Sequence, residues 1–254
     1  MNQAHAINIL GAFCGVRDFS ELSLSALYAQ TGLYQADVMV LFGGSILCGG
    51  DVLAKAIHSG IAKKYMIVGG AGHTTPVLRE KMQEAFPEIE TDNQTEAQLF
   101  NQYLELRYGL SADLLETQST NCGNNITYML AALESHHIPC ESIILSQDAT
   151  MQRRMAAGLR LVRPGIRIIN YATYQAEVIK QDGQLRFKDE IWGMWNMDHY
   201  VELLLGEIQR LRDDGYGPKG KGFIAHVDIP EDVEAAFAQL SAGFTVRQAN
   251  PAFA

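Results

Sequence analysis

Short, continuous apolar runs that end in small or polar residues recur along the chain. The run Val38–Gly43 stops at a second glycine and a serine, and the pattern returns at 65–70 and, without the glycines, at 142–146. Continuous apolar runs bounded by turn residues are typical of strands buried on both faces, as in a parallel sheet. Their alternation with small-residue loops and helical patterns predicts an open α/β sheet, in which ligands bind at the carboxyl ends of the strands.

The spacing of the remaining apolar positions predicts the order of elements. Two more strands are expected, one that ends at Glu116 and one over Ile166–Tyr171. Helices are expected within 1–35 and 151–161, over 49–59, 75–86 and 94–108, and from the 118–125 loop to His136. Beyond about Gln175 the pattern changes, and Ile191–Arg212 predicts an amphipathic helix. We therefore predict a sheet domain over 36–172 and a mostly helical annex made of 1–35 and 173–254.

Composition narrows the class of partner. The 254 residues are 47% hydrophobic and 19% charged, with a net charge of −9. Such a surface repels phosphate backbones and anionic membranes, so we expect a small-molecule ligand and neither nucleic acid nor membrane. The four cysteines form no CxxC pair, and no signal peptide or membrane-length apolar run is present. These features predict free thiols, no metal site and a cytoplasmic protein.

Two glycine-rich loops follow the first two predicted strands. The stretch 70–75 nearly forms the dinucleotide fingerprint GxGxxG, but it fails at the last position. We expect a loop whose backbone approaches a ligand closely, with a plain tight turn as the alternative. The candidate residues in these loops are Gly43, Gly44, Ser45, Gly69, Gly70, Gly72 and His73. The GxxxxGK match at 215–221 follows a helical pattern, so we interpret it as a surface loop and reject it as a phosphate loop.

Polar side chains gather at two predicted helix starts. Thr95 and Glu96 open one helix, where Asn93 as cap with Glu96 three residues later resembles a capping box. In a functional interpretation, Glu96 accepts hydrogen bonds from ribose hydroxyls or an amine. The stretch 118–125 carries more hydroxyl and amide groups than a cap needs, which favours ligand contact through Ser119, Asn121 and Asn125.

A third polar group follows the predicted strand at 142–146. Gln147 and Asp148 lie directly after it, and Arg153 and Arg154 lie in the next helix. An arginine near the sheet edge can hold a carboxylate by two parallel hydrogen bonds, although a solvated helix face is the plainer interpretation. Because neighbouring helical residues point about 100° apart, at most one of the two arginines faces the site. We assign this role to Arg153.

These stretches resemble the SanA/ElyC/YdcF family of bacterial proteins, and the C-terminal 210–218 and 226–228 resemble its YdcF branch. The resemblance spans nearly the whole chain and rests on 43–45, 69–73, 95–97, 118–125 and 147–154. It implies a Rossmann-like, doubly wound parallel sheet of about five strands with a smaller helical part, and binding of S-adenosyl-L-methionine with no reaction assigned. In two places the chain departs from the wider family, because Asn124 stands where a Glu is usual and Thr150 where a His is frequent.

The first hypothesis is a cytoplasmic S-adenosyl-L-methionine-binding protein, with a methyltransferase-like enzyme as its catalytic form. The adenosyl group is expected over Gly43–Ser45 and Gly69–His73, and Arg153 is expected to pair with the methionine carboxylate. Trp192 and Trp195 are expected to pack in the core, with closure of the pocket as the alternative. Two other functions stay open: a non-catalytic sensor of an adenosyl ligand or nucleotide, and an enzyme acting on nucleotide-sugar or lipid-carrier phosphates. The acceptor and the oligomeric state are left open.

Overall fold

The computed structural model describes residues 1–72 and 74–247 of the chain. The helices are α1 (Gln3–Cys14), α2 (Leu24–Thr31), α3 (Cys48–Ser59), α4 (Thr75–Ala85), α5 (Glu96–Tyr108), α6 (Cys122–Ser135), α7 (Gln152–Val162), α8 (Met197–Leu211) and α9 (Glu231–Ser241). The strands are β1 (Ala36–Phe42), β2 (Ala62–Val68), β3 (Leu114–Glu116), β4 (Ser142–Ser146), β5 (Arg167–Asn170), β6 (Val178–Gln181) and β7 (Gln184–Phe187).

The first five strands form one parallel sheet in the order β3-β2-β1-β4-β5, which confirms the predicted α/β fold. The chain proceeds outward from β1 through β2 to β3 and then crosses back to place β4 on the other side of β1. This reversal makes a switch point between β1 and β4, where the connections leave in opposite directions. A crevice outside the carboxyl ends of the strands is expected there.

The two faces of the sheet are covered by different helices, because neighbouring residues of a strand point to opposite sides. Met39 and Leu41 pack in a cluster with Tyr103 of α5 and with residues of α2, α3 and α4. Val38 and Val40 pack in a second cluster with residues of α6 and α7. Both faces of β1 are therefore apolar, which explains its uninterrupted hydrophobic run.

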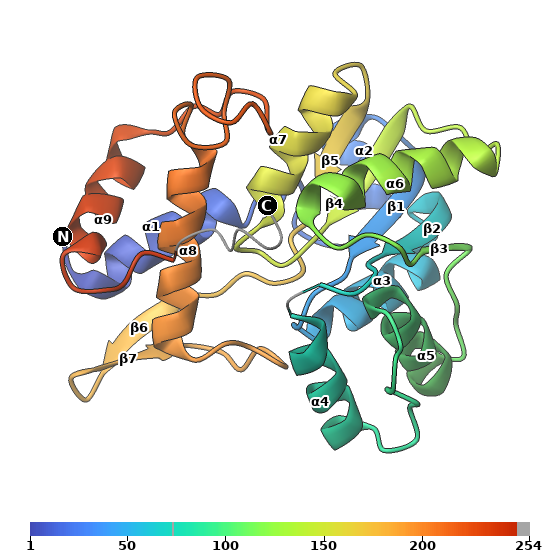
Figure 1. Cartoon of the computed structure of the whole chain (residues 1–254), viewed down its shortest axis with the longest axis horizontal. Coiled ribbons are helices and arrows are strands. Elements are labelled where there is room, and N and C mark those ends of the chain that lie inside the picture. The colour runs from blue at the N-terminus through green and yellow to red at the C-terminus, as the bar shows by residue number, and fades with distance from the viewer. Residues whose placement is uncertain (73, 248–254) are drawn as a thin grey trace.

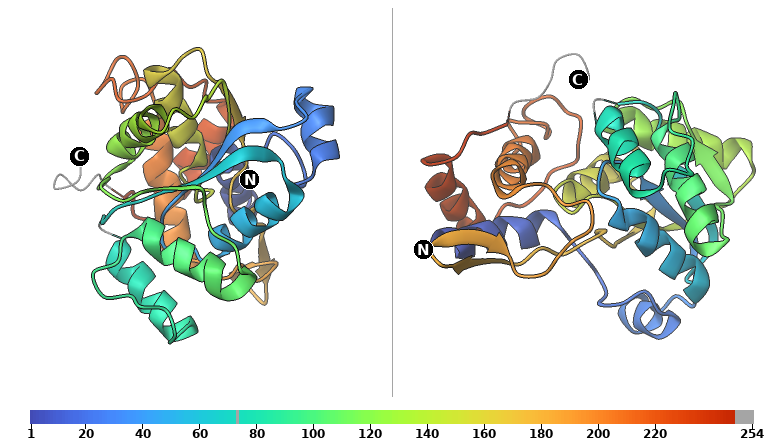
Figure 2. Two further views of the ribbon diagram at one scale, coloured as in Figure 1. Left: turned by 90° about the vertical axis from the view of Figure 1, so that its right-hand side faces the viewer. Right: turned by 90° about the horizontal axis from the view of Figure 1, so that it is seen from below.

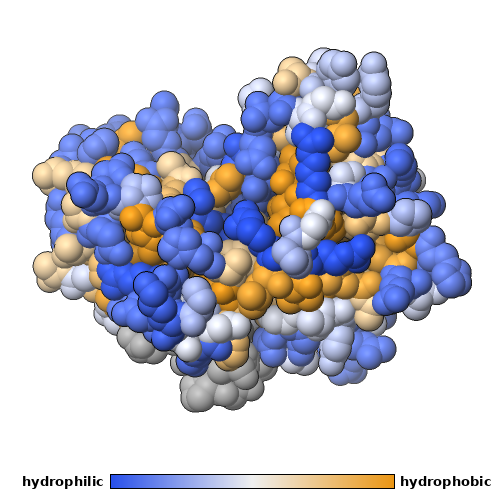
Figure 3. All heavy atoms as spheres, turned by 90° about the horizontal axis from the view of Figure 1, so that it is seen from above, coloured by the Kyte–Doolittle hydropathy of each residue, from blue (hydrophilic) through white to orange (hydrophobic). Residues whose placement is uncertain are grey.

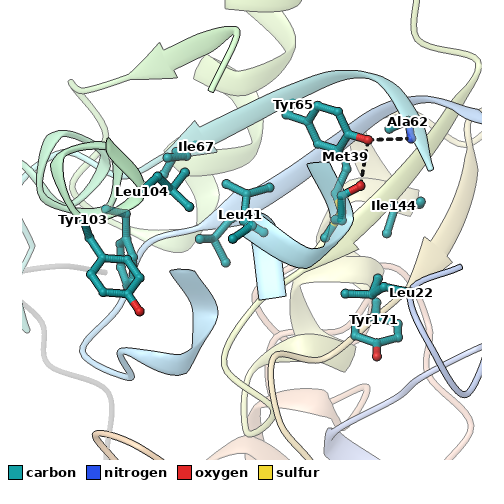
Figure 4. Packing of buried hydrophobic residues seen from close by; sticks show 14 of the residues in the cluster. Leu22, Met39, Leu41, Ala62, Tyr65, Ile67, Tyr103, Leu104, Ile144 and Tyr171 are labelled. Atoms are coloured by element: carbon teal, nitrogen blue, oxygen red, sulfur yellow. Dashed lines mark hydrogen bonds between the residues drawn. The ribbon is translucent and has the colours of Figure 1, made fainter. Parts of the chain in front are cut away.

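The buried tyrosine at the start of the sheet has its hydroxyl paired on both sides. Tyr65 donates a hydrogen bond to the Ala56 carbonyl at 2.9 Å and accepts one from the Ala62 amide at 3.1 Å. Figure 4 shows these bonds among the apolar side chains of the cluster. The tyrosine thus ties the last turn of α3 to the start of β2, which begins three residues earlier than the apolar run predicts.

The annex lies beside the sheet as a second group of elements (Figures 1 and 2). Leu10 of α1, Leu204 and Ile208 of α8 and Leu240 of α9 share one apolar cluster, which also takes in side chains of β6 and β7. Residues 19–31, which we had grouped with the annex, pack instead in the cluster of α3 and α5, with Leu27 fully buried there.

Two helix starts differ from the prediction. Thr95, not Asn93, is the N-cap of α5, and it forms a capping box with Gln98. Asn93 instead adopts a left-handed conformation in the preceding turn, with φ 57°. The predicted helix over 191–212 begins only at Met197, because Asn196 caps it and Gly193, with φ 77°, turns the chain just before.

The prediction missed the β6–β7 hairpin and α9. Asp182 and Gly183 connect the two strands, and both have positive φ values. An Asp-Gly pair between short alternating segments is a strong hairpin signal, so this element was readable from the sequence. The start of α9 was also readable, because Pro230 is followed by three acidic residues in the first turn.

Candidate functional site

A cavity of about 560 Å³ opens at the carboxyl ends of β1, β2 and β4, at the switch point of the sheet. Its walls are the loops that follow these strands, the first turns of α6 and α7, and the annex. Most of the site residues predicted from the sequence line it together: Gly43, Gly44, Ser45, Gly70, Gly72, Glu96, Ser119, Asn121, Asn125, Gln147 and Asp148.

Three of the predicted residues that the structure describes are not part of the cavity lining. Gly69 lies behind Glu96, and Thr95 is used as the cap of α5. Arg153 points toward α1, where its Nε donates to the Phe13 carbonyl and its guanidinium lies 4.1 Å from the Phe13 ring. His73 lies outside the described residues.

The glycines of the two loops make room mainly for protein atoms. A Cβ on Gly43 would lie 2.6 Å from Oε2 of Glu96, and one on Gly69 would lie 2.9 Å from its Cβ. At Gly70 a Cβ would come within 2.2 Å of the Ser119 carbonyl oxygen, where the loop after β3 crosses the loop after β2. A Cβ on Gly44 or Gly72 would have more room, with the nearest atoms at 3.7 and 3.3 Å. These glycines therefore allow the loops to cross and a carboxyl group to lie over bare backbone.

Glu96 is the buried carboxyl group of this end of the cavity. Its Oε1 accepts hydrogen bonds from the hydroxyls of Thr75 at 2.9 Å and Thr74 at 3.3 Å. In the described part of the chain Oε2 accepts none. Burial raises the pKa of Glu96 above its ordinary value, and the two threonine hydroxyls partly offset this. A carboxyl group in such a position accepts a hydrogen bond or a positive charge from a bound molecule.

The loop after β4 supplies a second carboxylate. Oδ1 of Asp148 accepts hydrogen bonds from the amide and hydroxyl of Thr150 and from the hydroxyl of Tyr174, and Oδ2 accepts one from Nε1 of Trp195 at 3.3 Å. Asp148 is thus held by four donors. Gln147 uses Oε1 on the Asp148 amide, and among the described residues no partner meets its Nε2.

The hydroxyl of Ser45 belongs to the loop after β1, at the same end of the cavity. It is buried, and within the described residues it has no hydrogen-bond partner. Burying a hydroxyl without a partner costs free energy, so such a group is a natural contact for a ligand.

The polar stretch before α6 divides between structure and cavity. Asn121 and Asn124 form a capping box, and Ser119 donates to Glu116, which also accepts from the Gln118 amide. The amide side chain of Asn125 lines the cavity and has no hydrogen-bond partner within residues 1–72 and 74–247. Many of the polar side chains in the stretch 118–125 therefore form hydrogen bonds within two turns and are not free for a ligand.

Of the two neighbouring arginines of α7, Arg154 lines the cavity and Arg153 does not, which corrects the assignment of Arg153. Its Nη2 and Nε donate to the two oxygens of Glu207 at 3.0 and 2.5 Å, and this ion pair joins α7 to α8 of the annex. Burial alone lowers the pKa of Arg154, but Cys122 and Glu207 more than offset this, so that the pKa lies above its ordinary value. Arg210 of α8 also donates to Glu207, at 3.2 Å.

The annex contributes a wall of the cavity, which the sequence analysis gave only as an alternative role for Trp192 and Trp195. Trp195 lines the cavity and Trp192 does not. Trp195 bonds Asp148, while Trp192 packs with Tyr103 in the core of the sheet domain. The other annex residues of the lining come from α8, from the loop after it and from the C-terminal segment: Leu203, Glu207, Arg210, Tyr216, Gly222, Phe223, Ile224 and Arg247. Helical spacing at 203, 207 and 210 marks one face of α8, but it does not say which partner that face meets.

No model of a known protein family matches the chain. The resemblance to the SanA/ElyC/YdcF family therefore stays a prediction. None of the helices in the described ranges is both long and apolar enough to cross a membrane. Within the same ranges, no three His, Cys, Asp or Glu side chains are grouped as a metal site would require.

Proposed function

We propose that the chain binds S-adenosyl-L-methionine in the cavity at the switch point. The observation that carries the proposal is Glu96, a buried carboxyl group that lines a cavity at the carboxyl edge of a doubly wound parallel sheet and whose Oε2 accepts no hydrogen bond from the described residues. The cavity has the volume of a site for a molecule of this size. Crevices in this position of such sheets are the usual sites of adenosyl and nucleotide ligands.

The groups around the cavity fit the chemistry of this ligand. S-adenosyl-L-methionine carries a ribose diol and two positive charges, on the sulfonium and the amino group. Glu96 and Asp148 give this end of the cavity two carboxyl groups, which suit the positive charges and the diol. Ser45, Asn125 and Gln147 present a hydroxyl and two amides for the remaining polar groups.

Methyl transfer is the reaction class that we attach to this binding. The sulfonium is already reactive, so the protein mainly has to align an acceptor with the methyl group and exclude water. Asn124 and Thr150, the two residues at which the chain differs from the wider SanA/ElyC/YdcF family, have structural roles. Asn124 is part of the capping box of α6, and the hydroxyl of Thr150 donates a hydrogen bond to Asp148. Neither is a general base at neutral pH, which suits a reaction that relies on alignment.

Calorimetry with four ligands tests the proposal: S-adenosyl-L-methionine, S-adenosyl-L-homocysteine, adenosine and a uridine-diphosphate sugar. We expect the first to bind more tightly than adenosine, because the carboxyl groups attract its positive charges. Preference for the sugar nucleotide would refute the proposal. Equal binding of the first two ligands, with no methyl transfer to any acceptor tried, would favour a sensor over an enzyme.

Glu96→Gln sharpens this test. The change keeps the shape and removes the charge, so we expect S-adenosyl-L-methionine to bind about 10-fold to 100-fold more weakly, since a hydrogen bond to a charged group contributes about 1.5–3 kcal/mol. Asp51→Asn is the matched control, because Asp51 also accepts two hydroxyl hydrogen bonds, from Tyr103 and Tyr108, but lies outside the cavity. Equal weakening by both variants would show that Glu96 acts through the fold alone.

A further inference from the structure

The cavity does not end at the sheet edge but continues along one face of α7. Met151, Arg154, Met155, Gly158, Leu161 and Val162 line it, at the spacing of a single helical stripe. The eleven residues of α7 span about 16 Å at 1.5 Å per residue, so a groove that follows this face extends well beyond the ends of the strands. Side chains of α6 form one wall of this groove, and α8 with the loop after it forms the other.

The inner part of this groove is cationic. Arg154 and Arg210 share the carboxylate of Glu207, so these three side chains together carry a net positive charge. All three line the cavity, and the ion pair of Arg154 and Glu207 is 11% and 3% exposed. A charge held this far from water interacts strongly with an anionic group of a ligand.

The outer part of the groove is apolar and open. Leu161, Val162 and Phe223 line it with exposed fractions of 45%, 48% and 51%. Behind them Ile126 and Ile224 approach α7 at Gly158, where a Cβ would lie 2.7 Å from the Cδ1 of Ile126. Hydrophobic atoms gather in the middle of the face that Figure 3 shows, which is the face above α7 and the loop after α8 in Figure 1. An apolar rim of this kind marks a binding surface.

From this order of charge and apolar surface we infer a second ligand subsite, for a free small molecule with an anionic head and an apolar tail. The head, a carboxylate or a phosphate, lies at Arg154 and Arg210. The tail follows α7 past Gly158 to Leu161, Val162 and Phe223. This subsite goes beyond the proposed function, because it uses the annex wall of the cavity and leaves the strand-end loops to the adenosyl ligand.

Calorimetry with octyl phosphate below its micelle concentration tests the inference, with octanoate, octanol and octyltrimethylammonium for comparison. We expect the two anions to bind at least about 10-fold more tightly than octanol and the cation not to bind, because only the anions pair with the arginines. Arg210→Gln is expected to weaken octyl phosphate by about 10-fold or more. Octanol that binds as tightly as octyl phosphate would overturn the anionic head.

Two leucines of similar exposure provide the control for the tail. Leu161→Ser removes an apolar contact and should weaken octyl phosphate by about 10-fold. Leu106→Ser, on α5 and 47% exposed, lies outside the cavity and should have no effect. If both changes weaken binding equally, or if neither weakens it, the subsite is overturned.

The experiment also separates this subsite from adenosyl binding and from a membrane surface. Leu161→Ser should leave the affinity for S-adenosyl-L-methionine unchanged, and Glu96→Gln should leave that for octyl phosphate unchanged. If octyl phosphate binds and S-adenosyl-L-methionine does not, the proposed function fails and the subsite stands. Sedimentation with phosphatidylglycerol vesicles, combined with no binding of monomeric octyl phosphate, would show that the rim meets a membrane and would overturn the inference.

Discussion

The two ends of the cavity are built in different ways. At the sheet edge, four short loops follow the parallel strands β1, β2, β3 and β4, and glycine backbone and short polar side chains form the walls. At the annex end, long side chains from α7, α8 and the loop after α8 meet across the boundary between two apolar clusters. The first end depends on close backbone approach, whereas the second depends on a buried carboxylate that is shared by two arginines and on apolar contact.

This difference shows where each end is sensitive to change. Where the loops cross with no space for a Cβ, only glycine is tolerated. A buried ion pair tolerates replacement of both partners better than loss of one, because the remaining charge is left without compensation. The predictions below test this contrast, starting with the largest expected effect.

Removal of one charge from the annex end should have the largest effect on stability. We expect Arg154→Ala to lower the free energy of unfolding by about 3 kcal/mol, because Glu207 then loses its main partner and keeps only Arg210. Arg212→Ala is the control, since its pair with Glu234 is 31% and 40% exposed and should contribute only about 0–1 kcal/mol. Urea denaturation measures both. Equal losses would contradict the importance of burial.

A single methyl group should disturb the sheet-edge end by a smaller amount. Gly70→Ala places a Cβ 2.2 Å from the Ser119 carbonyl oxygen, which is backbone and can move only with its loop. We expect a loss of about 1–3 kcal/mol, as for other overpacked sites. Gly165→Ala meets no atom within 4 Å and should leave the melting temperature nearly unchanged. If the two variants melt alike, the loops do not cross as tightly as the structure has them.

The smallest expected effect is the contribution of Glu96 to the pH dependence of the free energy of unfolding. Burial raises its pKa, so the folded protein holds this proton at pH values where the unfolded chain has lost it. The contribution of Glu96 to stability should therefore fall as the pH rises above about 4.5 and become constant above the raised pKa. Urea denaturation across this range should show the fall in the parent chain and not in Glu96→Gln. The same slope in both would assign it to other groups.

Much of the sheet-edge end was predictable because its signals are local. The apolar run before Gly43 fixes where β1 ends, and parallel strands bring their ends to one edge. The same reasoning placed Glu96, Ser119 and Asp148 together. It did not distinguish a glycine that faces a ligand from one that faces Glu96, because that depends on contacts between loops distant in sequence.

The choice between Arg153 and Arg154 illustrates the limit. The spacing allowed only one of them to face the cavity, but the direction of α7 around its axis depends on Phe13 and Glu207, which lie in other helices. The helix over 191–212 was set too long for a similar reason, since the turn at Gly193 packs against Leu47. The hairpin at 182–183 was a readable signal that was missed.

The sequence by itself determined the five strands of the parallel sheet, most of the helices and the edge of the sheet where polar groups collect. These features follow from apolar periodicity and turn chemistry, which act over a few residues. Only the tertiary structure decided that α8 and the loop after it close the cavity, and that Arg154 meets a carboxylate 53 residues away. Such pairings depend on how whole elements pack, and local sequence patterns do not specify that packing.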